Sequence, residues 1–222
     1  MKSKRFYRQL IKGTAALHIR TNMVASVGNI ENALGQYYKL VEAIAPILLM
    51  VGCRAETDSM QGLMDELTEN VGEERGSRTK GIPHKTLLQN ALRNELRIDI
   101  SGIKTNNATK NFLNSLMKSA MFETLSKALG RIYALEATAV PELIMVRELI
   151  KKFARREGIE IPAASELLEF IKIHVLDFEV GHESGLRNTL KPCNLNWEEF
   201  DKGFLETLRD MQTWWDKLAL GE

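Results

Sequence analysis

The sequence is poor in cysteine and proline and contains no long hydrophobic run. Its 222 residues include two cysteines, Cys53 and Cys193, which lie far apart and belong to no Cys-x-x-Cys pair. A disulfide framework or a zinc knuckle is therefore not expected, and a reducing cytosol suits the chain. No segment approaches the ~18 apolar residues that a membrane-spanning helix needs. The 30 basic and 29 acidic residues give a net charge of +1, which indicates neither a nucleic-acid partner nor an acidic surface as partner.

Basic residues are concentrated at the N-terminus. Six of them precede the first acid, Glu31, namely Lys2, Lys4, Arg5, Arg8, Lys12 and Arg20. Because Arg8 and Lys12 interrupt the apolar core that a signal peptide needs, we expect a cytoplasmic protein, with an organelle transit peptide as the alternative on composition. We predict that residues 1–25 form a basic arm that packs on the domain.

Apolar residues recur at helical spacing through the rest of the chain, and no run of alternating β-branched residues interrupts them. This pattern predicts an all-α fold of about seven to eight helices in a single domain over residues 1–222. Gly158 is expected to end one helix and Asn196 to begin the last. Aromatic residues such as Tyr37 and Phe178 fit the core better than the wall of a pocket.

Ionisable side chains interrupt four of these apolar ladders. They are Glu74, His84, Glu136 and the stretch from His174 to His182, which also contains Asp177 and Glu179. Singly, a glutamate at the edge of an apolar stripe reaches water, and a lone histidine is an ordinary hydrogen-bonded residue. Together, such groups would cost several kcal/mol to bury unless they neutralise one another or a cation. Since histidine with carboxylate is a ligand set that iron and manganese prefer, the pattern favours a shared metal site.

The spacing between His174 and His182 does not suit a regular helix. At about 100° per residue, the two histidines are separated by about 80° around the axis, and Asp177 and Glu179 fall on different sides. One extra residue in a turn, a π-bulge, would bring His174, one acid and His182 into line, and such bulges are frequent at functional sites. We therefore predict a π-bulge between His174 and His182.

Three segments resemble the heme-oxygenase-like diiron oxidases and oxygenases. Residues 70–76 and Pro83-His84 are similar to that family's Asn-x-x-x-Glu-x-Gly and Pro-His segment. Residues 133–137 resemble its Tyr-x-x-Glu helix, and residues 174–182 resemble its His-x-x-x-Asp-x-x-His helix with one residue inserted. The last of these segments looks closest to cyanobacterial members of the superfamily, which include an enzyme that turns a brominated tryptophan into an indole nitrile.

The resemblance implies a heme-oxygenase-like bundle that binds two iron ions. The ligands it implies are Glu74, His84, Glu136, His174, His182 and one acid between the last two. The inserted residue leaves two candidates for that acid, because Glu179 keeps the family's spacing to His182, whereas Asp177 keeps its residue type and its face relative to His174. Asp177 is narrowly preferred. Glu74 and Glu136 are the carboxylates expected to take part in the chemistry directly.

The function that the resemblance implies is the oxidation of a small substrate with dioxygen as co-substrate. An amino acid or its derivative, tryptophan-like compounds included, would undergo oxidative C–C cleavage to a nitrile or N-oxygenation in natural-product biosynthesis, and a homodimer is the expected assembly. Arg131, Lys118 and Arg187 are candidates for binding the substrate carboxylate. The alternatives are a metal-independent enzyme, similar to a thiaminase or a quinone-cofactor synthase, and a non-catalytic helical binding protein.

Overall fold

The structure, a computed structural model, describes residues 30–162 and 164–222. The predicted basic arm, residues 1–25, lies outside the described residues. Within those ranges there are eight α-helices, a 3-10 turn and a π-helical segment, and no strand. In chain order they are α2 (Ile30–Thr57), α3 (Gln61–Glu74), α4 (His84–Leu96), η1 (Ile100–Gly102), α5 (Asn107–Phe122), α6 (Leu125–Glu157), α7 (Glu166–Ile173), the π-helical η2 (His174–Phe178), α8 (Glu179–Leu190) and α9 (Trp197–Leu220). The predicted all-α class and number of helices are confirmed.

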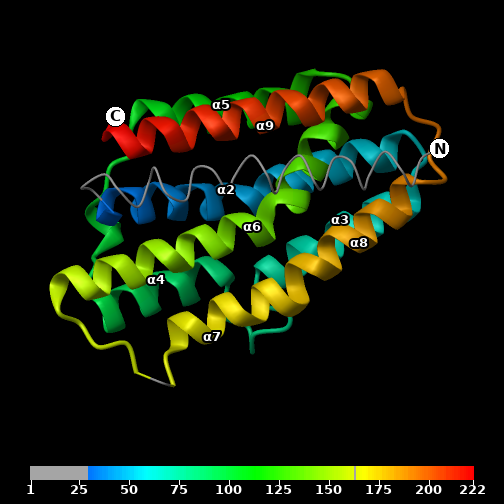
Figure 1. Ribbon diagram of the computed structural model, residues 1–222. Helices are drawn as coiled ribbons and strands as arrows, with labels where there is room; N and C mark the ends of the chain where they lie inside the picture. The colour runs from blue at the N-terminus through cyan, green and yellow to red at the C-terminus, as the bar shows by residue number, and fades with distance from the viewer. Residues whose placement is uncertain (1–29, 163) are drawn as a thin grey trace.

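The helices are arranged around α2 and α6, the two longest of the described chain (Figure 1). Helices α5 and α9 lie together on one side of this pair. On the other side α3 packs against α8 and α4 packs against α7. Helix α6 runs diagonally between the two sides and contacts α9 on one of them and α7 and α8 on the other.

The helix ends follow the local sequence. Gly158 ends α6 with a positive φ of 65°, a backbone conformation that glycine adopts without strain. Asn196 caps α9, because its side-chain oxygen accepts hydrogen bonds from the backbone N–H groups of Glu198 and Glu199. Both predicted helix ends are confirmed.

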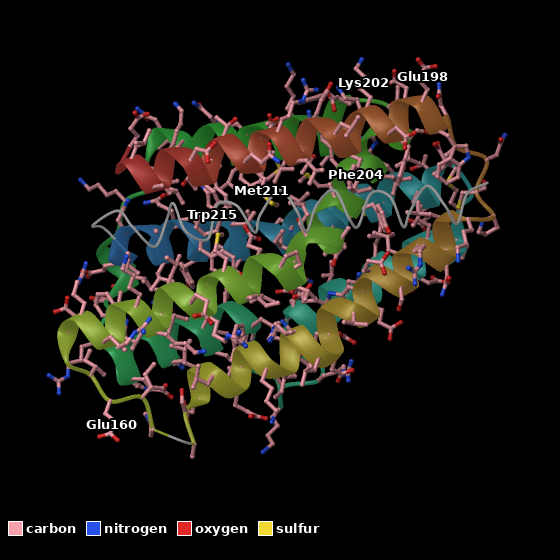
Figure 2. The ribbon with its side chains drawn as sticks, viewed as in Figure 1. Glu160, Glu198, Lys202, Phe204, Met211 and Trp215 are labelled. Carbon is pink, nitrogen blue, oxygen red and sulfur yellow. The ribbon has the colours of Figure 1, made fainter. Side chains whose placement is uncertain are left out.

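Helix α9 covers the centre of the bundle with its apolar face. Figure 2 shows Phe204, Met211 and Trp215 pointing from α9 towards α2 and α6, whereas Glu198 and Lys202 point away. Phe204 and Trp215 are fully buried. Burial of such aromatic side chains contributes roughly 1.5–3 kcal/mol each, so this face fixes α9 on the helices that carry the site.

Two glycines allow α6 and α9 to approach closely. A Cβ atom added at Gly130 would overlap the carbonyl oxygen of Phe200, and one added at Gly203 would overlap the carbonyl oxygen of Lys127. Because neither glycine has a side chain, the backbone of the opposite helix can pass directly against it. Because Glu136 lies less than two turns beyond Gly130, this contact also sets the position of a candidate site residue.

Within the described residues, no helix combines the length and the apolar character that crossing a membrane requires.

Candidate metal centre

The predicted π-bulge is present. Helix α7 continues without interruption into the π-helical residues 174–178 and then into α8. The wider turn changes the angular relation between the two histidines, so that His174 and His182 are both buried, with 4% and 5% of their surface exposed. The sequence therefore predicted the local backbone correctly from the failure of a regular helix to align these residues.

The structure brings Glu179, and not Asp177, to His182. Asp177 is exposed, and its carboxylate accepts a hydrogen bond of 2.7 Å from Arg78. Glu179 points inward, with its Oε2 3.8 Å from Nδ1 of His182. The preference for Asp177 assumed that the angle to His174 follows regular helical geometry, and the π turn changes that angle. This preference is not supported by the structure.

Two of the predicted residues form a tight group with Glu179. Oxygen atoms of Glu136 and Glu179 and a nitrogen of His182 all lie within 4.8 Å of one another, and all three residues could hold a metal ion. His182 Nδ1 is 3.5 Å from Glu136 Oε2. We call Glu136, Glu179 and His182 the first ligand group.

The other three predicted residues meet beside it. Nδ1 of His84 lies 3.0 Å from Nε2 of His174 and 3.5 Å from Oε1 of Glu74. The second ring nitrogen of His174, Nδ1, donates to the carbonyl oxygen of Phe170 at 2.7 Å, so Nε2 carries the lone pair of the neutral ring and directs it at His84. We call Glu74, His84 and His174 the second ligand group.

Glu73 is a functional candidate that the sequence analysis missed. Its Oε2 lies 3.0 Å from Nε2 of His182, and its Oε1 accepts a hydrogen bond of 3.2 Å from Arg78. When Nε2 of His182 donates to Glu73, Nδ1 carries the lone pair and faces Glu136 and Glu179. This is the arrangement of a carboxylate that orients a metal-binding histidine through its other nitrogen. The signal in the sequence was the acidic pair Glu73-Glu74, of which only the second was considered.

A cavity of about 70 Å³ adjoins both ligand groups. Glu74, Glu136, Glu179 and His182 line it, together with Tyr37 and Glu142, and aliphatic side chains from α2 and α6 form the rest of its wall. The volume is small beside the ~300–1,000 Å³ typical of ligand pockets, so the cavity suits a small molecule. Tyr37 belongs to the buried core, as predicted, and also lines this cavity.

A second recess approaches the ligand groups from another direction. It is a groove of about 880 Å³ between α4 and α7, and His174 and Phe178 form part of its wall. The ring of Phe178 stacks on His84, with the centroids 5.1 Å apart. The groove therefore reaches the second ligand group at His174, whereas the cavity adjoins both groups.

None of the three basic residues predicted to bind a substrate carboxylate lines the cavity. Arg131 is buried but forms ion pairs with Glu206 at 2.7 Å and Asp210 at 3.1 Å, which join α6 to α9. Lys118 is exposed, and Arg187 pairs with Glu183 at 3.3 Å. The buried position of Arg131 thus reflects helix packing and not substrate binding.

Comparison with known proteins identifies the family. The model of one protein family, described as "Domain of Unknown Function with solved-structure structure (DUF3865)", matches residues 3–221 of the chain. The chain belongs to DUF3865. No curated protein matches the DUF3865 chain.

Solved structures confirm the fold of the DUF3865 chain. Two crystal structures of a CADD-like protein of unknown function from Nostoc punctiforme PCC 73102 are similar to it. The first has 28% identity and a TM-score of 0.87, covering 99% of this chain and 96% of that chain. The second has 25% identity and a TM-score of 0.84, covering 99% and 94%. A TenA homolog from Pseudomonas syringae pv. tomato str. DC3000 shares 13% identity, with a TM-score of 0.72, covering 100% and 93%. The DUF3865 chain therefore has a TenA-like, heme-oxygenase-like helical fold, and the comparisons establish no specific relation to a nitrile synthase.

The electrostatics of the DUF3865 site show an excess of buried negative charge. Burial opposes the charged form of His182, but Glu136, followed by Glu179 and Glu73, outweighs it and raises the pKa of His182 to about 10. Burial, reinforced by Glu136, raises the pKa of Glu179 well above its usual value. Burial and the adjacent His84 ring lower the pKa of His174 to about 4, so His174 is neutral. One imidazolium thus faces several carboxylates, which leaves room for further positive charge.

The donor set of the DUF3865 chain fits a pair of iron ions. The two ligand groups together offer three imidazole nitrogens and three carboxylates, a mixture that suits iron and manganese. In the second ligand group, Nδ1 of His84 meets Nε2 of His174 and Oε1 of Glu74. Two facing imidazole nitrogens and a carboxylate oxygen supply lone pairs that a cation can bind. The residues present are therefore compatible with the metals that the family resemblance implies.

Proposed function

We propose that this protein is a non-heme diiron oxidase or oxygenase that uses dioxygen to oxidise a small substrate. The observation that carries the proposal is the convergence of two neighbouring groups of histidine and carboxylate ligands at one small, buried cavity. Protein cores exclude such groups unless they are paired or bind metal. The resemblance to the diiron family supports the choice of iron.

Each ligand group would hold one ion. Glu136, Glu179 and His182 would bind one, and Glu74, His84 and His174 would bind the other. Glu136 lines the same cavity as Glu74 and Glu179, so its carboxylate would be available to both ions. Ferrous ions supply the reduction of dioxygen when they are bound.

The remaining residues control access and orientation. Glu73 would fix His182 with Nδ1 towards the first ion, and Arg78 would hold Glu73 in place. The cavity leaves room for only a small substrate group, and its aliphatic side chains would contact the apolar part of that group. An amino acid or its derivative, oxidised to a nitrile or at nitrogen, is the substrate class that the family resemblance supports.

The proposal is tested by anaerobic reconstitution with Fe(II). Iron retained after desalting should amount to two ions per chain in the wild type, and less in Glu136→Gln. Glu148→Gln is the matched control, because Glu148 lies on the same helix, is half-exposed outside the cavity, and pairs with Arg147 and Lys151. Dioxygen uptake should require iron and should increase when amino acids, tryptophan included, are added, with products identified by mass spectrometry. Absence of bound iron in the wild type would contradict the proposal and favour a metal-independent enzyme or a binding protein.

A further inference from the structure

Glu142 is a buried acid in the cavity that the metal centre does not use. It lies on α6, six residues beyond Glu136, which is about 9 Å along the helix axis. Only 5% of its surface is exposed. Its Oε1 accepts a hydrogen bond of 2.7 Å from Nε1 of Trp215, and among the described residues no hydrogen bond or ion pair reaches Oε2. One oxygen of this carboxyl group is therefore available within the cavity that Glu142 lines.

Tyr37 and Trp215 hold this end of the cavity in place. The two rings are stacked, with centroids 6.3 Å apart, and Trp215 is fully buried. Burial, together with the nearby Glu142, raises the pKa of Tyr37 well above its usual value, so its hydroxyl remains neutral. A neutral hydroxyl and a carboxyl group thus lie at one cavity, and both can accept hydrogen bonds.

Trp215 alone does not require an acid at position 142. A glutamine would accept the indole hydrogen bond equally well and would avoid burying a charge, which is costly without a partner. Burial raises the pKa of Glu142 to about 7, although the bond from Trp215 opposes the shift. The described residues that line the cavity include no lysine or arginine, and His182 already faces Glu73, Glu136 and Glu179. The carboxylate therefore lacks a cationic partner within this chain's described residues.

We propose that Glu142 binds the ammonium group of an amine substrate in the cavity beside the metal centre. The ammonium would donate to the free Oε2 of Glu142, with the Tyr37 hydroxyl as a second acceptor. The aliphatic wall formed by residues such as Leu40, Val41 and Ala139 would contact the hydrocarbon part of the substrate. This inference rests on the proposed oxidase function and narrows its substrates to compounds with a cationic amine. It also removes the need for a basic residue to receive a substrate carboxylate.

The test compares propylamine with 1-propanol and propionate, which have similar size but no positive charge. Binding is measured by calorimetry at pH 7.5 on protein loaded with Zn(II), which does not react with dioxygen. We expect wild type to bind propylamine at least 10-fold more tightly than 1-propanol or propionate, because a charge-assisted hydrogen bond is stronger than a neutral one. Glu142→Gln should lose this preference and still bind Zn(II) as the wild type does. Glu148→Gln should behave as wild type.

The outcomes separate this inference from the proposed function. If neither protein binds metal but metal-free wild type prefers propylamine and Glu142→Gln does not, the diiron function fails and the amine site stands. If both bind metal and bind propylamine equally, or neither binds propylamine, the amine site is refuted and the diiron function stands. The comparison of propylamine with 1-propanol on wild type requires no variant, so a misfolded Glu142→Gln would not prevent a decision.

Discussion

Replacement of Glu179 by glutamine should weaken iron binding and, at the same time, stabilise the metal-free protein. Glu179 belongs to the first ligand group, with 12% of its side chain exposed, and its carboxylate and that of Glu136 both approach Nδ1 of His182. The substitution keeps the size and the hydrogen-bonding capacity of the side chain and removes its charge. We expect opposite effects on iron binding and on stability, because the negative charge of Glu179 would attract the metal ion but does not stabilise the metal-free fold.

The magnitude follows from the distances. With an effective dielectric constant of about 20, repulsion between Glu136 and Glu179 at up to 4.8 Å is worth about 3 kcal/mol. Attraction between Glu179 and protonated His182 at 3.8 Å is worth about 4 kcal/mol, so the two terms nearly cancel. Burial of this carboxyl group is then not compensated by its neighbours, so Glu179 bears the cost either of a buried charge or of taking up a proton, as its raised pKa indicates. We expect Glu179→Gln to raise the free energy of unfolding by about 1–3 kcal/mol, with a rise in Tm of about 2–4 °C for each kcal/mol.

The assay is thermal unfolding, followed by circular dichroism with and without anaerobic Fe(II), together with calorimetric titration of Fe(II). Loss of a partner outside the ligand shell typically costs 10–100-fold in metal affinity, so loss of a ligand should cost at least about 100-fold. Asp177→Asn is the control, since its exposed ion pair with Arg78 contributes only about 0–1 kcal/mol. The reasoning is refuted if Asp177→Asn loses iron and Glu179→Gln retains it, or if Glu179→Gln destabilises the metal-free protein.

Two further predictions concern stability. The pKa of Glu142, raised to about 7 from 4.5, lies above its unfolded value, so the stability it contributes is complete below pH 4.5 and is lost as pH rises through 7. The loss is on the order of 3 kcal/mol, and denaturant titrations at several pH values should give a flatter profile for Glu142→Gln, whereas an unchanged profile would contradict the assignment. Gly130→Ala should cost about 1–3 kcal/mol, because the new Cβ would overlap a backbone carbonyl oxygen that cannot rotate away. Gly62→Ala, with no atom within 4 Å of the new Cβ, should raise the free energy of unfolding by about 0.5–1 kcal/mol. Urea unfolding that finds Gly130→Ala more stable than Gly62→Ala would refute the packing argument.

The fold was predictable because its signals are local. Helical periodicity, the glycine at position 158 and the asparagine at position 196 each act within a few residues of the chain. The π turn was predictable for a similar reason, since the helical angles around His174 and His182 do not close without it.

The details of the site depended on contacts between distant segments. Which acid follows the π turn inward is decided partly by Arg78, which lies 99 residues before Asp177 and pairs with it at the surface. Glu73 could not be distinguished from Glu74 by periodicity, because both can reach the interior from the end of α3. Glu142 gave no signal before its contact with Trp215 was known, since that contact spans 73 residues.

The π turn would also couple the binding of one ion to the binding of the other. The continuous helix from α7 to α8 supplies His174 to one ligand group and Glu179 and His182 to the other. Two ions held by this helix would be thermodynamically linked, because the first ion would restrict the motion of the turn and the second would not bear that entropic cost again. Iron would then bind with positive cooperativity, and chains carrying a single ion would be the minority at half-saturation.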